Sequence, residues 1–332
     1  MTSTTAPRVS VVLGSGGARG YAHIGVITEL RELGYDIVGI SGSSMGALVG
    51  GLQAAGRLDD FAEWAKSLTQ GAVLRLLDPS FTSAGVLRAG KILDVVREIL
   101  GDIDIERLPI PYTAVATDLI AGRSVWLQRG PVHTAIRASI AIPGVIAPHV
   151  VDGRLLADGG ILDPLPMAPL CAVNADLTLA VSLNGGDPTA SNPSADDSER
   201  GLPAGRLNRM LRSTSALLDT SGARSLLDRP TARAILDRFS SDESEHETDY
   251  ETEESASGAA GVPKLGAFEV MNRTIDIAQA ALTRHQLAAY PPDLLIEVPR
   301  VACRSLDFHR AAELIEVGRE LTRRALDAAK ST

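Results

Sequence analysis

A serine between two glycines is the residue best suited to chemistry in this sequence. Ser44 lies at the centre of Gly42-Ser43-Ser44-Met45-Gly46, which matches the pattern Gly-x-Ser-x-Gly. In a tight turn from a strand into a helix, this pattern exposes the serine hydroxyl as a nucleophile. Gly42 and Gly46 let the chain fold back without Cβ clashes, and the helix directs N–H groups at a developing oxyanion. We therefore predict Ser44 as a nucleophile, with an ordinary glycine-rich turn as the alternative.

A base must take the proton of this serine, because a neutral hydroxyl is a poor nucleophile. Of the six histidines only His149 is a serious candidate, since it lies near the Asp158 region. Asp158 is the stronger candidate, because it ends a short predicted strand and is followed by Gly159 and Gly160. Its carboxylate would lie free at a sheet edge and accept the proton directly. The alternative is a simple Asp-Gly turn, as in Asp152-Gly153.

A second glycine-rich turn follows the first predicted strand. Counted from Gly14, it fails the dinucleotide pattern Gly-x-Gly-x-x-Gly because Arg19 occupies the last position, and it lacks the Gly-Lys-Ser/Thr of a P-loop. We expect an oxyanion hole instead, in which backbone N–H groups face Ser44. The N–H groups are those of Gly16, Gly17, Ala18 and Arg19. The Arg19 side chain would either hold a phosphate head group or pair with a carboxylate. A purely structural turn is the alternative for the whole loop.

The segments around these residues alternate between strand and helix. Short apolar runs at 9–13 and 37–41 predict buried strands, and the runs at 22–33 and 47–55 have helical spacing. This order favours neighbouring parallel strands in an α/β fold, which would place both glycine turns at one sheet edge. Further predicted strands are Tyr112–Thr117, Ser124–Leu127, Arg154–Ala157, Leu177–Leu183 and Leu294–Val298, and further predicted helices are Leu58–Leu77, Val132–Ser139, Phe268–Leu287 and Phe308–Ala328.

Composition narrows the class of protein. With 332 residues and 45% hydrophobic residues, the chain can bury a sizeable core. Its net charge is −9, but eight acidic residues fall in the run 240–254 and the rest is nearly neutral. No broad basic surface is implied, so we expect no nucleic-acid partner. Two cysteines without metal-ligand spacing and a polar N-terminus predict a cytoplasmic protein without a disulfide framework or a metal.

The chain divides into four parts by composition. We predict a disordered N-terminus at 1–7, a catalytic core at 8–185, an insertion at 186–263, and C-terminal helices and a strand at 264–332 that pack on the core. The insertion has eight arginines at 200–238, followed by the acidic run. A basic amphipathic helix there would give peripheral contact with anionic membrane. A solvated helix and a disordered loop are the alternative, which we favour.

Four segments in order resemble the patatin-like phospholipase family, particularly its small bacterial members. They are Leu13–His23, Gly42–Gly46, Ala138–Pro143 with Pro148, and Asp158–Gly160. The resemblance implies a three-layer α/β/α sandwich with a mostly parallel central sheet. It also implies a Ser44–Asp158 dyad without histidine, an oxyanion hole at Gly16–Gly20, and cleavage of acyl esters in phospholipids, lysophospholipids or neutral lipids without a cofactor or metal. The family often has glycine where this chain has Ser15.

Two other functions stay open beside this serine acyl hydrolase. A Ser-His-Asp esterase would use Ser44 with a histidine, but the α/β-hydrolase fold places several strands before its nucleophile, and here only one precedes. A lipid-binding or regulatory protein with a vestigial site is the non-catalytic alternative. The presence of Ser44, Asp158 and both glycine turns argues against it.

Overall fold

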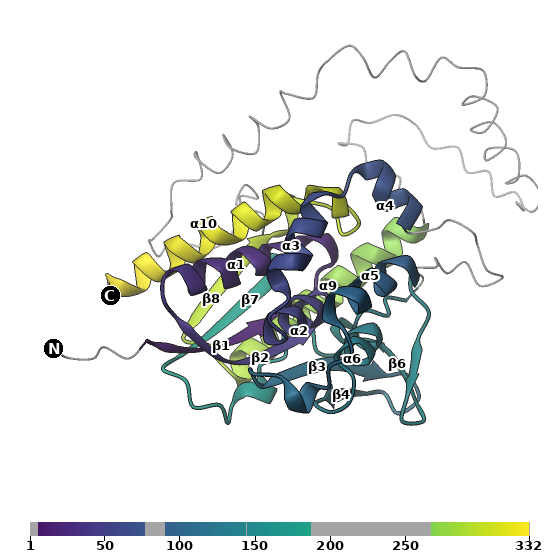
Figure 1. The fold of residues 1–332 in the computed structure, drawn as a ribbon, viewed down its shortest axis with the longest axis horizontal. Coiled ribbons are helices and arrows are strands. Elements are labelled where there is room, and N and C mark those ends of the chain that lie inside the picture. The colour runs from purple at the N-terminus through teal and green to yellow at the C-terminus, as the bar shows by residue number, and fades with distance from the viewer. Residues whose placement is uncertain (1–5, 77–89, 144, 187–266, 332) are drawn as a thin grey trace, which may run out of the picture. The chain divides into compact units, whose positions relative to one another are not determined.

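A mixed β-sheet forms the centre of the computed structural model, which describes residues 6–76, 90–143, 145–186 and 267–331. The strands are β1 (Arg8–Leu13), β2 (Asp36–Ser43), β3 (Tyr112–Asp118), β4 (Arg123–Leu127), β5 (His149–Val151), β6 (Arg154–Asp158), β7 (Leu177–Gly185) and β8 (Leu294–Pro299). Within the described ranges they make one eight-stranded sheet in the order β5-β6-β3-β2-β1-β7-β8, with β4 also pairing with β3 (Figure 1).

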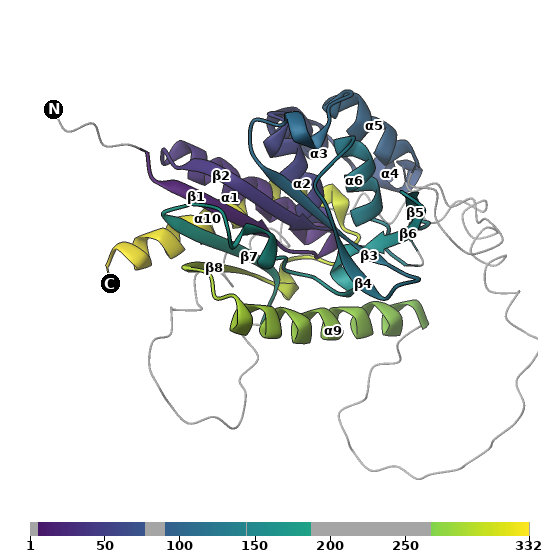
Figure 2. The ribbon, with the colours of Figure 1, turned by 90° about the horizontal axis from the view of Figure 1, so that it is seen from below.

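Helices cover both faces of this sheet. They are α1 (Tyr21–Glu32), α2 (Met45–Ala54), α3 (Leu58–Lys66), α4 (Gln70–Leu76), α5 (Gly90–Leu100), α6 (Val132–Ser139), α9 (Ala267–Ala289) and α10 (Ala311–Lys330). In Figure 2, α9 lies on one side of the sheet, and α1, α2, α3, α5 and α6 lie on the other. This arrangement confirms the predicted three-layer α/β/α sandwich.

The sheet is parallel in one part and antiparallel in the other. β1 pairs in parallel with β2 and β7, β2 with β3, and β7 with β8. Beyond this parallel part, β4 and β6 are antiparallel to β3, and β5 is antiparallel to β6. The antiparallel part is larger than the expected mostly parallel sheet suggests, and it supplies Asp158.

Both faces of β1 are buried, which explains why its residues beyond Arg8 are apolar except for the buried Ser10. Val9, Val11 and Leu13 belong to the large core cluster with residues of α1 and α2. Val12 points to the opposite face and packs in a smaller cluster with Leu165. A strand covered by helices on both sides needs no alternating polar positions, so apolar residues occur on both of its faces.

Some element predictions are wrong in their bounds. The predicted helix 58–77 is two helices, α3 and α4, because the helical hydrogen-bond pattern is interrupted at 67–69. The Ser67 N–H bonds back to the carbonyls of Glu63 and Trp64 at the end of α3, and Thr69 Oγ1 accepts from the N–H of Ala72 at the start of α4. Helix α5 and the three-residue strand β5 were not predicted.

Several predictions lie outside the described residues. The arginine-rich stretch and the acidic run fall in 187–266, so the two interpretations of that insertion stay predictions. The division of the chain into four parts stays a prediction as well. In the part of the chain that the structure covers, no helix combines the length and apolar character needed to cross a bilayer.

Helix α10 joins the C-terminal part of the chain to α1 through a very close backbone approach. A Cβ atom on Gly25 would lie 1.9 Å from the Ile315 carbonyl oxygen, and one on Gly318 would lie 2.0 Å from the Ala22 carbonyl oxygen. Beside this crossing, the buried Glu29 carboxylate accepts from Arg323 Nε at 2.9 Å. The two helices therefore meet backbone to backbone, with an ion pair at the side.

The crossing predicts a large difference between two glycine-to-alanine substitutions. Gly318→Ala forces the helices apart, because its Cβ meets a backbone carbonyl, and we expect it to lower the free energy of unfolding by about 1–3 kcal/mol. Gly71→Ala in α4 is the matched control, since its Cβ would have no neighbour within 4 Å. Chemical denaturation of both variants tests this, and equal stability of the two would contradict the close approach.

Candidate active site

The turn between β2 and α2 holds Ser44 in an unusual backbone conformation. Its φ is 56° and its ψ is −122°, a region that residues with side chains rarely adopt. The glycines around it are required sterically. A Cβ on Gly42 would lie 2.3 Å from the Gly46 carbonyl carbon, and one on Gly46 would lie 2.0 Å from the Leu13 carbonyl oxygen. The Gly-x-Ser-x-Gly pattern thus follows from backbone segments that touch one another.

Ser44 and Asp158 are in direct contact. Ser44 Oγ donates a hydrogen bond to Asp158 Oδ2 at 2.5 Å, and the Gly160 N–H donates to Asp158 Oδ1 at 2.7 Å. Both side chains are buried. Burial raises the pKa of Asp158 to about 6, while the hydrogen bonds from Ser44 and Gly160 act in the opposite direction. The carboxylate is therefore a stronger base than an exposed aspartate would be.

The strand β3 brings these two residues together. Ser43, at the end of β2, pairs with Val115, and Asp158, at the end of β6, pairs with the next residue, Ala116. Strand β4 occupies the other edge of β3 along 114–118. Because a strand has only two edges, β2 and β6 must follow one another along the same edge. They run in opposite directions, so their carboxyl ends meet head to head.

The side chain of Ser139 holds the backbone of the turn at Ser44. Ser139 Oγ accepts from the Ser44 N–H at 2.9 Å and donates to the Val115 carbonyl oxygen at 2.6 Å. Nearby, the Asp158 N–H donates to the Ala141 carbonyl oxygen at 2.9 Å. Ser139 therefore links α6, β3 and the backbone of Ser44. Sequence reasoning included it in a family-like segment but assigned it no role.

The first glycine turn lies beside Ser44, and only part of it is open to a ligand. The Ala18 N–H donates to the Ser305 carbonyl oxygen at 2.8 Å, so the expected contribution of Ala18 to an oxyanion hole does not hold in this arrangement. Arg19 and Gly20 lie late in the 3-10 turn Gly17–Gly20, where N–H groups bond to carbonyls three residues earlier. Among the described residues, no backbone acceptor is found for the N–H groups of Gly16 and Gly17, and both residues line the cavity beside Ser44.

Helix α9 supports this turn at two points. Arg19 Nη2 lies 3.3 Å from Asp276 Oδ1, and Ser15 Oγ donates to Gln279 Oε1 at 3.0 Å. Of the two interpretations of Arg19, the structure therefore has the pairing with a carboxylate. Asp276 and Gln279 were missed in the sequence, because they lie more than 250 positions from the residues they contact. No local pattern marks them.

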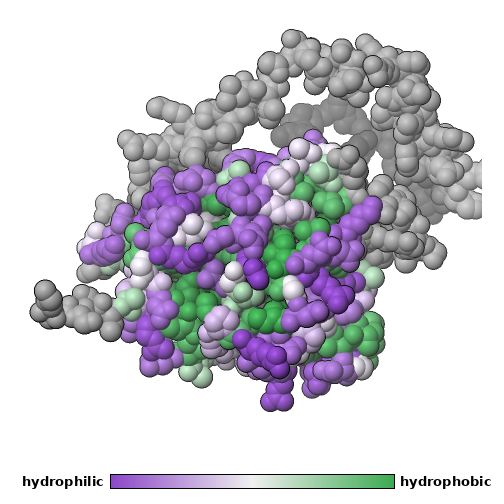
Figure 3. Space-filling view, in the orientation of Figure 1, coloured by the Kyte–Doolittle hydropathy of each residue, from purple (hydrophilic) through white to green (hydrophobic). Residues whose placement is uncertain are grey.

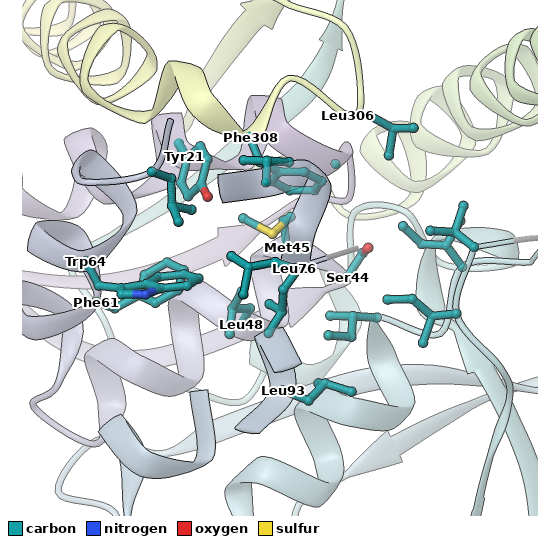
Figure 4. Close-up of a pocket in the computed structure, with 18 residues that line it drawn as sticks. Tyr21, Ser44, Met45, Leu48, Phe61, Trp64, Leu76, Leu93, Leu306 and Phe308 are labelled. Carbon is teal, nitrogen blue, oxygen red and sulfur yellow. The ribbon is translucent and has the colours of Figure 1, made fainter. Parts of the chain in front are cut away.

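An apolar cavity opens on one side of Ser44. Apart from Gly17 and Ser44, every residue that lines it is apolar or aromatic (Figure 4). In Figure 4 the Ser44 hydroxyl lies at one side, and Phe61 and Trp64 lie at the far side. Phe61 also belongs to the large core cluster, and Trp64 packs against that cluster. Figure 3 shows hydrophobic residues gathered around the region of α2 and α3, from which several lining residues come.

A second, more polar cavity also reaches Ser44. Its polar lining residues are Ser15, Ser44, Asp158, Asp276, Gln279 and Ser305. Gly17 and Ser44 line both cavities, so an ester carbonyl at Ser44 would have space for one arm on each side. Within the described ranges, no three His, Cys, Asp or Glu side chains gather in a way that could hold a metal ion.

The alternative base, His149, lies apart from this arrangement. It is on β5, where it pairs with Leu156, and it lines neither of the two cavities at Ser44. The Asp152-Gly153 pair does form a simple turn between β5 and β6, with φ of 49° and 73°. Asp158 differs from it, because its side chain accepts from the Gly160 N–H and from Ser44.

This chain is similar to known proteins over more than the site residues described above. A family model described as patatin-like phospholipase matches residues 11–170. Uncharacterized NTE family proteins of Mycobacterium bovis and Mycobacterium tuberculosis are 67% identical over 338 residues, which covers 98% of this chain and 93% of theirs. The neuropathy target esterase sws of Drosophila melanogaster is 31% identical over 200 residues, or 58% of this chain and 14% of that protein. Because the family model spans Ser44 and Asp158 and the mycobacterial relatives match nearly the full length, this chain belongs to the patatin-like phospholipase family.

Proposed function

We propose that this protein is a serine acyl hydrolase that cleaves lipid acyl esters with a Ser44–Asp158 dyad. The observation that carries the proposal is the 2.5 Å hydrogen bond from Ser44 Oγ to Asp158 Oδ2, at the junction of an apolar and a polar cavity. A nucleophile in contact with its base is the basic requirement of covalent acyl transfer. The names of the relatives, a phospholipase family and an esterase, support the same class of reaction.

In the first step, Asp158 takes the Ser44 proton while Oγ forms a bond to the ester carbonyl carbon. The negative charge that develops on the carbonyl oxygen is stabilised by the N–H groups of Gly16 and Gly17 and by the positive end of α2. The ester C–O bond then breaks, and the proton on Asp158 passes to the leaving alcohol oxygen. The products of this step are a free alcohol and an acyl group on Ser44.

In the second step, water replaces the alcohol. Asp158 takes a proton from this water as its oxygen attacks the acyl carbon, and the same N–H groups hold the oxyanion. The bond to Ser44 Oγ breaks, the proton returns to that oxygen, and the fatty acid leaves. One carboxylate thus acts as base and then as acid in each half of the reaction.

The apolar cavity is the natural place for the acyl chain. Each methylene group that leaves water contributes about 0.8 kcal/mol, so a cavity lined almost entirely by apolar residues favours an ester with a hydrocarbon arm. Among its lining residues, the Tyr21 ring contacts the rings of both Phe61 and Phe308. A lipid acyl ester therefore fits this side of Ser44 better than a short polar ester.

The role of Ser44 predicts a loss of activity that its neighbour does not share. We expect Ser44→Ala to abolish labelling by a fluorophosphonate probe and to reduce hydrolysis of p-nitrophenyl butyrate by roughly 10⁴-fold or more. Ser43→Ala is the matched control, because Ser43 Oγ is buried and has no hydrogen-bond partner among the described residues. Continued labelling of Ser44→Ala would assign the nucleophile elsewhere, and no labelling of folded wild type would favour the non-catalytic alternative.

The choice of base is tested by a second pair of variants. Asp158→Asn keeps the size of the side chain but cannot take the Ser44 proton, so we expect kcat to fall by about 10²–10⁴-fold. His149→Ala should keep nearly full activity, because His149 lines neither cavity. The two kcat values on one ester decide between the dyad and a Ser-His-Asp esterase. The opposite pattern would rule out the dyad.

The raised pKa of Asp158 predicts two pH effects. Because the base must be ionised, kcat/KM should rise with pH, with a midpoint near 6, and level off above it. Since the folded pKa exceeds the ordinary value of 3.8, the contribution of this group to stability falls as pH rises from about 4 to 6. Asp158→Asn should therefore gain on the order of 1–3 kcal/mol relative to wild type between pH 4 and pH 7.

Denaturation of both proteins across this pH range measures the second effect. Asp163, whose pKa burial also raises to about 6, is present in both proteins and cancels in the difference. A stability difference that does not change with pH would show that folding does not raise the pKa of Asp158. An activity profile that is flat between pH 5 and pH 7 would argue against Asp158 as the base.

A further inference from the structure

The polar cavity beside Ser44 has only acidic groups among its charged lining residues. These are Asp158 and Asp276, and the remaining polar lining of the described cavity comes from Ser15, Ser44, Gln279 and Ser305. The opposite cavity is apolar, so an acyl chain occupies that one and the leaving alcohol must occupy this one. The polar side chains that meet the leaving alcohol are therefore two carboxylates, an amide and hydroxyl groups. The rest of the lining is the backbone of Gly16 and Gly17, whose N–H groups are assigned to the oxyanion, and six apolar residues: Ile142, Pro143, Val145, Ile161, Ile275 and Leu306.

Two guanidinium groups, those of Arg19 and Arg300, contact Asp276 but do not line this cavity. Arg19 has a side chain that is only 4% exposed, does not line the cavity, and lies 3.3 Å from Asp276 Oδ1. Arg300 Nη2 donates to the Asp276 carbonyl oxygen at 3.2 Å and does not line the cavity either. Asp276 itself lines the cavity with a side chain that is 28% exposed. A ligand in this cavity would therefore contact the Asp276 carboxylate and neither of the two arginines.

The acidic lining of this cavity affects which leaving group it can accept. A phosphate is recognised by arginine, lysine or clustered N–H donors, and near two partly buried carboxylates it would be repelled. An uncharged alcohol with free hydroxyl groups meets no such repulsion. Its hydroxyls can donate to Asp276 and exchange hydrogen bonds with Gln279 and Ser305.

We infer that the leaving-group side of this site selects uncharged, hydroxyl-bearing alcohols over phosphate-bearing ones, which makes acylglycerols the preferred substrate class. The inference rests on the proposed function, because it concerns the alcohol that departs from the acylated Ser44. Asp276 is the residue that sets the preference, and Arg19 serves to hold Asp276 and the glycine turn in place.

The test uses two esters that differ only in the phosphate. These are 1-octanoyl-glycerol and 1-octanoyl lysophosphatidic acid, both below their aggregation concentrations, with released octanoate measured by mass spectrometry. We expect kcat/KM of the full-length protein to be on the order of tenfold to a hundredfold higher for the uncharged ester. Equal or faster cleavage of the phosphate ester would overturn the inference. So would cleavage of p-nitrophenyl butyrate with no cleavage of either glyceryl ester.

A pair of variants assigns the preference to its residue. Asp276→Asn keeps a hydrogen-bond acceptor for Arg19 but removes the charge, so the ratio between the two esters should fall several-fold, mainly through faster cleavage of the phosphate ester. Asp102→Asn removes the same charge from a side chain that is 85% exposed, and it should leave the ratio unchanged. An unchanged ratio in Asp276→Asn would overturn the assignment. Absence of hydrolysis of all three esters by wild type would instead remove the proposed function, and this inference with it.

Discussion

The hydrogen bond between Ser44 and Asp158 depends on two strand ends that meet on one edge of β3. Neither residue could reach the other if β6 ran parallel to β3, because its carboxyl end would then point away from β2. A buried carboxylate is costly unless it is hydrogen-bonded, and Asp158 is held by Ser44 and Gly160. The antiparallel pairing of β6 with β3 therefore places Asp158 next to Ser44.

Close backbone contacts give this arrangement its rigidity. At the elbow, Gly42 and Gly46 allow the chain to touch itself and β1, and Ser139 ties the Ser44 N–H to β3. The strained backbone of Ser44 is stable because these contacts hold it on all sides. Glycine at a close backbone approach also allows α10 to pack on α1.

The C-terminal part of the chain completes the site. Helix α9 brings Asp276 and Gln279 to the first glycine turn, and the segment before α10 brings Ser305 and Phe308 to the two cavities. The family model ends at residue 170, so these contributions lie outside the part of the chain that it matches. The elements around Ser44 hold the reactive groups, whereas the C-terminal elements shape the space where the two arms of an ester would lie.

The sequence alone determined the features that depend on local sterics and periodicity. The strand–turn–helix around Ser44, the two glycine turns and an α/β fold with neighbouring parallel strands could be predicted, because steric limits on glycine and the spacing of apolar residues act over a few positions. The three-layer sandwich followed from the resemblance to the patatin-like phospholipase family. The split of the helix at 67–69, the capture of the Ala18 N–H by Ser305 and the pairing of Arg19 with Asp276 could not. Only the tertiary structure decided these, because each depends on partners brought together by the register of the sheet and by helices far along the chain, which no local pattern encodes.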